Sequence, residues 1–399
     1  MTDHTSNDTD PRSEGPDRFP RPPGATAVLA LEDGTLVWGR GAGASGEVVG
    51  EVCFNTAMSG CQEILTDPSY HSQILTFCFP HAGGTGANPE DMEADVPAVR
   101  GAVFRAALTT PSNWRATVSL NDWLVSRGIV ALCGVDTRAL TARIRTKGAL
   151  CGVLAHNPDG VFDPDALFAR ARSWSGLAGL DLASAVSTRE SYTWDQTLWS
   201  WKDGGYGRLE SPRHHVVVVD YGVKRNMLRS LASLGCRVTV VPCTTPAADI
   251  LALNPDGIVL SSGPGDPAAT AVHAAPVIRE LLASGKPLMG VCLGHQLLAL
   301  ALGAKTVKME LGHRGANHPV KDLTTGRVEI TSMNHGFVVD RATLPAGVVE
   351  THTSLFDGVL EGLAVEGKPV FSVQYHPEAS PGPGDSHHLF RRFADLLAA

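Results

Sequence analysis

The chain has 399 residues, 43% hydrophobic and 19% charged, and is long enough for two or three domains with cores of their own. Its formal net charge of −8 argues against a broad nucleic-acid-binding surface, and no unbroken apolar run reaches the roughly 18 residues of a membrane span. The N-terminus lacks an apolar signal core and the eight cysteines form no CxxC pair, which indicates reduced thiols and a cytoplasmic location.

The N-terminal part of the chain divides into a polar leader and a first domain. Residues 1–23 are rich in Asp, Pro, Ser and Arg, so we expect a disordered leader; their acidic residues disfavour the alternative of a targeting peptide. Residues 24–190 are predicted to form a mixed α/β domain that begins with a β-hairpin around Asp33-Gly34. Further strands are predicted in residues 50–58 and 72–80, and short helices in 113–128 and 137–148.

The second half of the chain has a different pattern. Residues 191–213 contain three tryptophans among glycine, serine and charged residues, and we expect a linker that packs on a neighbouring element. In residues 214–399, continuous apolar runs alternate with helix-forming segments. The predicted fold class is therefore α/β, with a C-terminal doubly wound, mostly parallel sheet that binds ligands at the carboxyl ends of its strands.

One cysteine lies where a predicted strand turns into a predicted helix, in the segment Gly290-Val291-Cys292-Leu293-Gly294. The flanking glycines allow the tight bend of a nucleophile elbow, and the helix N-terminus behind the side chain favours thiolate over thiol. The N–H of Leu293 could then donate to an oxyanion. The alternative is a small, buried and inert cysteine, and these five residues alone do not decide between the two.

Three other stretches favour the nucleophile. Residues 261–267, SSGPGDP, could expose a second oxyanion donor, although a plain turn also fits them. His376 and Glu378 end a predicted strand, and because residues i and i+2 of an extended chain face the same way, Glu378 can orient the His376 ring. Residues 331–340 place polar residues and a glycine between strand-like runs, as expected of a substrate-binding loop.

Other patterns lack the context that their chemistry needs. Residues 41–46 match the dinucleotide fingerprint, but the sequence that follows predicts a strand and not a helix. The histidine pairs at 214–215 and 387–388 have no third ligand at metal-site spacing, so we expect surface residues there and no metal on this chain. No Gly-x-x-x-x-Gly-Lys-Ser/Thr loop is present to hold ATP. His295 is expected to pack inside a helix.

The motifs SSGPGDP, GVCLGHQLLA and QYHPEAS together resemble those of class I, triad-type glutamine amidotransferases over residues 214–399. From about residue 25 to the end, the chain is also similar to the small subunit of glutamine-dependent carbamoyl-phosphate synthetase. The segments that carry this similarity are EVCFNTAMSGCQEILTDPSYHSQILTFCFPHAG, GVDTRALTARIRTKGA, VDYGVKRNMLR, RGANHPVKD, MNHGFVVD and SLFDGVLEG. Cys61 and Gly384 depart from the family pattern, which has tyrosine and histidine there, and neither touches the expected triad.

The resemblance implies a role for several residues. Cys292 would be the nucleophile, His376 the base and Glu378 its partner. Gly263 and the Leu293 N–H would form the oxyanion hole. Glutamine would be held by Ser69, Gly263, Gly265, Leu293, Gln296, Asn334, Gly336 and Phe337.

The resemblance also implies an activity and a partner. L-glutamine would be hydrolysed through a cysteine thioester, and ammonia would pass through a tunnel to a large subunit in a heterodimer or higher assembly. That subunit would hold ATP and magnesium and make carbamoyl phosphate from bicarbonate for arginine and pyrimidine synthesis, so no cofactor is expected on this chain. Residues 25–190 would mainly dock this partner, with Ser69 as their one contact with glutamine; no nucleic-acid or membrane partner is expected.

Two alternatives remain open. One is another class I amidotransferase, such as the glutamine-hydrolysing part of guanylate or anthranilate synthesis, which the fused first domain disfavours. The other is a non-catalytic regulatory partner of the same fold, which the presence of all three triad residues disfavours.

Overall fold

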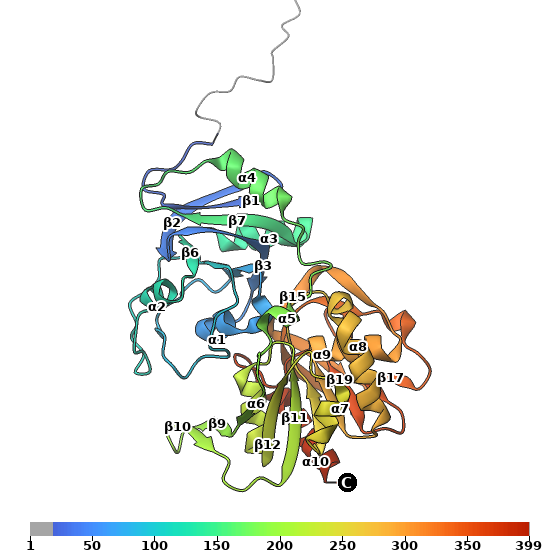
Figure 1. Ribbon diagram of the computed structural model, residues 1–399. Coiled ribbons are helices and arrows are strands. Elements are labelled where there is room, and N and C mark those ends of the chain that lie inside the picture. The colour runs from blue at the N-terminus through green and yellow to red at the C-terminus, as the bar shows by residue number, and fades with distance from the viewer. Residues whose placement is uncertain (1–18, 399) are drawn as a thin grey trace, which may run out of the picture.

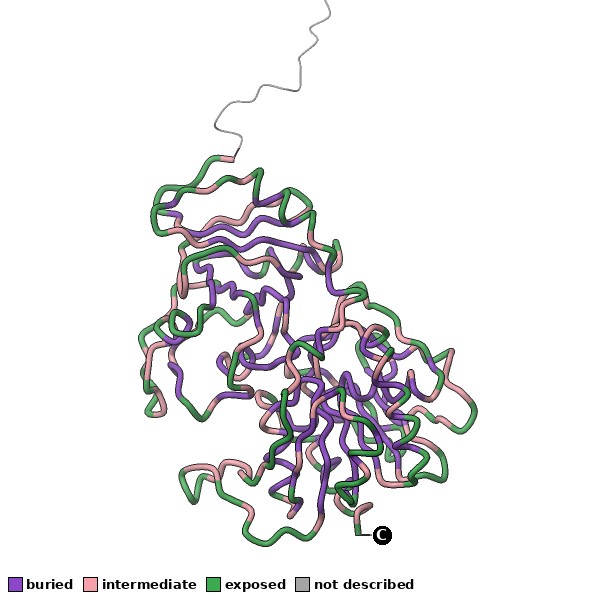
Figure 2. The backbone as a smooth tube through the Cα atoms, in the orientation of Figure 1, coloured by how far each residue is buried: buried purple, intermediate pink, exposed green. Residues whose placement is uncertain are grey.

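The computed structural model describes residues 19–398, which form two domains side by side (Figure 1). Most of the predicted leader, residues 1–18, lies outside the described residues. Figure 2 shows that the buried backbone is concentrated in the strands of both domains. Across residues 19–398, no helix has the length and apolar character to cross a membrane.

The N-terminal domain is a closed barrel of seven strands in the order β1-β2-β6-β5-β4-β3-β7. Its strands are β1 (Ala27–Leu31), β2 (Leu36–Gly43), β3 (Gly46–Asn55), β4 (Gln73–Phe77), β5 (Gly101–Val103), β6 (Val130–Cys133) and β7 (Leu150–His156). Its helices are α1 (Cys61–Thr66), η1 (Pro68–Tyr70), α2 (Leu120–Ser126), α3 (Thr137–Lys147) and α4 (Pro164–Ser173), whereas α5 (Ala183–Val186) packs with the core of the C-terminal domain. The antiparallel pairing of β1 and β2 confirms the predicted hairpin.

The barrel follows from the apolar runs of its strands. Leu29, Ile74 and Leu132 are fully buried in one cluster inside it. The alternate residues of β1, such as Val28, point outward and pack with Phe168 of α4. The helix predicted in residues 113–128 is shorter than expected: it starts after Ser119, whose hydroxyl accepts from the backbone N–H of Asp122 at 3.1 Å as an N-cap.

The C-terminal domain is built on a ten-stranded sheet in the order β16-β15-β17-β18-β19-β14-β13-β11-β12-β8. Its strands are β8 (Tyr192–Trp194), β11 (His214–Asp220), β12 (Cys236–Pro242), β13 (Gly257–Leu260), β14 (Leu288–Val291), β15 (Thr306–Asp322), β16 (Val328–Val339), β17 (Val348–Ser354), β18 (Leu360–Val365) and β19 (Val370–Val373). Its helices are α6 (Arg225–Ser233), α7 (Ala247–Ala252), α8 (Pro267–Ala283), α9 (Leu293–Leu302), η2 (Arg341–Thr343), η3 (Asp385–His387) and α10 (His388–Leu397).

The sheet is doubly wound, as predicted. Strands β12, β11, β13, β14 and β19 are parallel, and antiparallel strands extend both edges. Val216 and Val218 of β11 pack with α6 and α10, whereas Val217 and Val219 pack with α7, α8 and α9. Helices therefore cover both faces, and the carboxyl ends of the parallel strands are left for ligands (Figure 1).

Four local expectations need correction. Residues 191–213 are more than a linker, because β8 extends the sheet and β9 (Gln196–Ser200) pairs with β10 (Gly205–Arg208). Residues 331–340 lie almost wholly within β16 and form no loop. Strand β19 ends at Val373, so His376 and Glu378 lie beyond it, where the chain turns. His215, expected at the surface, is buried and its Nε2 lies 2.9 Å from the Thr239 hydroxyl.

Candidate active site

Cys292 occupies the strand–turn–helix bend predicted for it. It joins β14 to α9 with φ 53° and ψ −104°, a backbone conformation that is strained for any residue with a side chain. The two glycines are required by close packing: a Cβ at Gly294 would lie 2.1 Å from the carbonyl oxygen of Leu260, and one at Gly290 would lie 2.8 Å from that of Gly294. Such a bend is typical of a nucleophile elbow.

The thiol is buried in a polar setting, and Cys292 is only 2% exposed. Its Sγ donates to the carbonyl oxygen of Asn334 at 3.6 Å, and Nε2 of Gln374 donates to the sulfur at 3.7 Å. As the first residue of α9, Leu293 has no intrahelical acceptor for its N–H. A cysteine used only for packing would not need such polar partners.

The histidine and glutamate of the expected triad are in contact. Nδ1 of His376 lies 2.6 Å from Oε1 of Glu378, so its N–H donates to the carboxylate. The contact forms across a turn and not along an extended strand, and the backbone N–H of His376 donates to the Ser332 carbonyl at 2.9 Å. Within residues 19–398, Nε2 of His376 has no hydrogen-bond partner. This nitrogen is free to exchange a proton with a reacting group.

The charges of this pair are coupled. Burial opposes the charged form of His376, but Glu378 and the Cys292 thiol outweigh it and raise the pKa of His376 to about 10. Burial likewise opposes the charge of Glu378, whereas His376 and Lys224 lower the pKa of Glu378 to about 2. The histidine therefore holds a proton at neutral pH and can stabilise a neighbouring thiolate.

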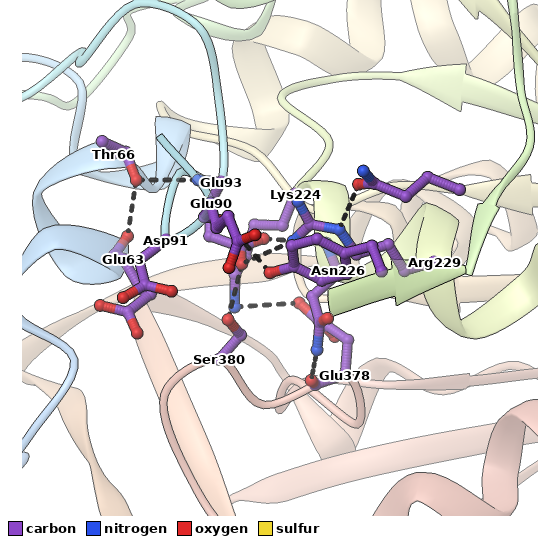
Figure 3. A network of polar contacts seen from close by, with 12 residues as sticks. Glu63, Thr66, Glu90, Asp91, Glu93, Lys224, Asn226, Arg229, Glu378 and Ser380 are labelled. Carbon is purple, nitrogen blue, oxygen red and sulfur yellow. Dashed lines mark hydrogen bonds and ion pairs between the residues drawn. The ribbon is translucent and has the colours of Figure 1, made fainter. Parts of the chain in front are cut away.

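A network of buried charged residues holds Glu378 in place (Figure 3). Nζ of Lys224 lies 3.4 Å from Oε1 of Glu378 and also donates to the Ala379 carbonyl. Glu93, from the N-terminal domain, accepts a hydrogen bond from the Ser380 hydroxyl at 2.6 Å. The segment that carries His376 and Glu378 is thus fixed by both domains. Sequence reasoning missed Lys224 and Glu93, although Lys224 lies in the short connection between the buried strand β11 and helix α6.

One pocket, here called the Cys292 pocket, brings most of the predicted site together. Together with Cys292 it is lined by Ser69, Gly263, Gly265, Gln296, Asn334, Gly336 and Phe337. The remaining predicted contact, Leu293, follows Cys292 and begins α9. Seven further lining residues were not among the predicted contacts: Glu51, Gln73, Leu177, Pro264, Lys308, Arg314 and His335.

The missed residues change the expected role of the first domain. Glu51 and Gln73 belong to β3 and β4, so the barrel supplies more of the pocket than Ser69 alone. A signal was present for Glu51, which is the one charged residue in the apolar run VVGEVCF. Its carboxylate lies 2.9 Å from Nζ of Lys308 and 3.7 Å from NH2 of Arg314, so opposite charges meet in the pocket.

Several lining groups are available to a ligand. The Ser69 hydroxyl is buried and, among the described residues, has no hydrogen-bond partner. Gln296 is oriented by bonds from its Nε2 to the Phe337 carbonyl at 2.7 Å and to Oε1 of Gln374 at 3.0 Å. A Cβ at Gly263 would lie 2.0 Å from the Tyr221 carbonyl oxygen, so only glycine fits there.

Comparison with known proteins agrees with this geometry. Residues 217–396 match the model of the family described as glutamine amidotransferase class-I. The C-terminal domain, with its elbow and its His–Glu pair, is therefore a class I glutamine amidotransferase domain. Residues 29–154 match the family model of the carbamoyl-phosphate synthase small chain, CPSase domain.

Full-length relatives define the family more narrowly. The chain is 63% identical over 381 residues to the carbamoyl phosphate synthase small chain of Caulobacter vibrioides. This alignment covers 94% of this chain and 98% of the relative. It is 58% identical over 397 residues to the carbamoyl phosphate synthase small chain of Bradyrhizobium diazoefficiens, and that alignment covers 98% of both chains. The chain belongs to the carbamoyl-phosphate synthase small-chain family. A solved glutamine amidotransferase of Thermotoga maritima aligns with 41% of this chain and 76% of that one, at 18% identity and a TM-score of 0.34.

Proposed function

We propose that the chain is the glutamine-hydrolysing subunit of carbamoyl-phosphate synthase and passes ammonia to a large subunit. The observation that carries the proposal is the strained elbow cysteine, Cys292, in one pocket with seven of the residues that the resemblance implies. The His376–Glu378 pair completes the set of groups that a cysteine nucleophile needs. Family membership supports the same activity.

The reaction begins when the Cys292 thiolate attacks the side-chain amide carbon of glutamine. The oxyanion accepts hydrogen bonds from the N–H groups of Leu293 and Gly263. His376, which holds a proton at Nε2, gives it to the amide nitrogen, and ammonia leaves as the thioester forms. The neutral imidazole then takes a proton from water, whose oxygen attacks the thioester and releases glutamate and the thiolate. Glu378 keeps the ring oriented and stabilises its charge in both steps.

The pocket fits the charges of a free amino acid. Glutamine carries a carboxylate and an ammonium group on its α-carbon, and the pocket presents Lys308, Arg314 and Glu51. We assign the α-carboxylate to the two cations and the α-ammonium to Glu51. Ser69 and Gln296 offer neutral polar groups for the remainder of the substrate.

We infer a route for ammonia from two further cavities, each of which shares a lining residue with the one before it. Asn334 lines both the Cys292 pocket and a second cavity, here called the inner cavity, which His376, Lys224 and Asp67 also line. Ala57 lines the inner cavity and an outer groove of the barrel domain, here called the Met58 groove. The groove contains Ala57, Met58, Ser59, Gly60, Cys61, Phe77, Phe79, His81, Ala82, Gly83, Gly84, Thr85, Thr109, Ser112 and Asn113. We assign the docking face for the large subunit to this groove.

The large subunit would perform the remaining chemistry. It would bind ATP and magnesium and form carbamoyl phosphate from bicarbonate and ammonia, in the cytoplasm, for arginine and pyrimidine synthesis. The test is to combine the chain with its large partner and to measure carbamoyl phosphate from glutamine and from free ammonia. A complex that uses ammonia but never glutamine would contradict the proposal.

A further inference from the structure

Three buried side chains from three strands converge beside the Cys292 pocket. His313 on β15 and His335 on β16 are cross-strand neighbours, and Glu361 lies on β18. Oε1 of Glu361 is 3.4 Å from Nδ1 of His313 and 3.8 Å from Nε2 of His335. One ligand atom from each of the three residues lies within 4.8 Å of the others.

The atoms that face one another approach at ion-pair distances but make no hydrogen bond. Among the described residues, no hydrogen-bond partner is found for Nδ1 of His313, Nε2 of His335 or either carboxylate oxygen of Glu361. Glu361 is completely buried, and both histidines are less than 10% exposed. Buried polar atoms without partners are costly and rare in folded proteins, so four of them around one point indicate a missing ligand.

The far side of each histidine ring is fixed by an acceptor. Nε2 of His313 lies 2.7 Å from Oδ2 of Asp357, and Nδ1 of His335 lies 3.0 Å from the Phe337 carbonyl oxygen. If each of these nitrogens donates its proton outward, the inner nitrogen of each ring presents a lone pair to the cluster. Histidines that bind metals are held in the same way, by a carboxylate or a backbone carbonyl on the other nitrogen.

We propose that His313, His335 and Glu361 bind a divalent transition-metal ion, and that zinc fits the donors best. Zinc accepts two imidazole nitrogens and one carboxylate oxygen, with water as a fourth ligand. Bonds of about 2.0–2.1 Å place tetrahedral ligand atoms about 3.3 Å apart, close to the 3.4 and 3.8 Å separations here. Magnesium and calcium are disfavoured because they prefer oxygen ligands.

The site would brace the substrate pocket. His335 lies between Asn334 and Gly336, and all three line the Cys292 pocket. An ion would tie this part of β16 to β15 and β18. Asp357 lies in the turn before β18 and its side chain is 40% exposed, so an ion could enter past it. No metal was expected from the sequence, because a spacing pattern reveals ligands only within one segment. His313, His335 and Glu361 come from separate strands.

The competing interpretation is a metal-free ion pair, in which a protonated His313 bridges Asp357 and Glu361. The two interpretations differ in zinc affinity. The experiment treats the full-length chain with a chelator, removes the chelator, and titrates Zn²⁺ against a competing dye. Elemental analysis of the zinc-loaded protein gives the stoichiometry, and the absorption spectrum of the Co²⁺-loaded protein identifies the donors.

We expect about one zinc ion per chain and a Co²⁺ spectrum without a thiolate charge-transfer band. Glu361→Gln and His313→Gln should weaken zinc binding by at least 100-fold, and Asp357→Asn, on the exposed turn, by about 10–100-fold. The matched control is Glu329→Gln, which removes another buried carboxylate that contacts a histidine, His388 at 2.5 Å, and should leave zinc affinity unchanged.

Three results would overturn the proposal. These are the absence of tight zinc binding to the wild-type chain, a thiolate band that moves the site to a cysteine, or unchanged affinity in the variants. If Glu361→Gln and His313→Gln do not fold, the Asp357→Asn affinity and the wild-type Co²⁺ spectrum decide alone.

Discussion

Asp67 of the barrel domain accepts a hydrogen bond from the side-chain amide of Asn334 at 3.2 Å, next to the nucleophile. The other carboxylate oxygen of Asp67 accepts from the backbone N–H of Ser69 at 2.9 Å. One buried carboxylate thus positions two residues of the Cys292 pocket that come from different domains. The substrate site is a product of the domain interface and not of the amidotransferase fold alone.

Asp67→Ala should therefore raise the KM for glutamine. Hydrogen bonds to a charged group contribute about 1.5–3 kcal/mol, so we expect an increase of about tenfold or more. Synthesis from free ammonia by the assembled complex should not change, because it bypasses the glutamine site and its chemistry is proposed to lie on the large subunit. Steady-state kinetics with both nitrogen donors test this. An unchanged KM for glutamine would contradict the positioning role of Asp67.

Cys292→Ala should abolish carbamoyl phosphate synthesis from glutamine in the complex with the large subunit. The variant cannot form the thioester, whereas the synthetase chemistry is proposed to lie on the partner. Ammonia-dependent synthesis should persist and serves as the control for assembly. Glutamine use by the variant would rule out the triad and would favour a regulatory role for the chain.

His376→Asn should damage the glutaminase more than Glu378→Gln does. The histidine transfers a proton in both halves of the reaction, a role worth about 10²–10⁴-fold in rate. The glutamate orients and stabilises the ring, and Lys224 and Asn226 continue to hold the segment that carries it. The test is the rate of glutamate release in a single turnover, measured for both variants. Equal losses would show that Glu378 does more than orient the histidine.

The pairing of His376 with Glu378 should appear in the pH dependence of stability. The folded state raises the pKa of His376 from 6.5 to about 10, because Glu378 and the Cys292 thiol overcome the opposing effect of burial. Its contribution is thus complete below about pH 6.5 and is lost as the pH rises through 10. The difference in free energy of unfolding between the wild type and His376→Asn should shrink over that window. Urea unfolding at several pH values measures it, and a constant difference would contradict the raised pKa.

The sequence predicted best what is encoded locally. The apolar run of β11 and the glycines around Cys292 determine their structures through close packing, and both predictions were confirmed. The closure of the barrel depends on the pairing of β7 with both β1 and β3. These pairings join strands that are far apart in the chain, so no local sequence pattern predicts them. The polar residues of β16 were interpreted as a loop because they interrupt an apolar run, yet they are strand residues that face a pocket.

The Met58 groove gives the last prediction, that Met58→Asp weakens association with the large subunit. Met58 is 76% exposed, lines the groove together with Phe79, and lies where the proposed ammonia route would reach the surface of the barrel. A charged side chain buried in a protein interface removes apolar contact and loses its hydration, which should lower the affinity roughly tenfold or more.

The matched control is Val272→Asp on α8, because Val272 is 79% exposed but lies on the other domain. Titration of the large subunit into each variant measures the affinity, and glutamine hydrolysis by the isolated chain checks that the site is intact. If both variants bind as tightly as the wild type, the large subunit docks elsewhere; if Val272→Asp alone binds weakly, it docks on the amidotransferase domain.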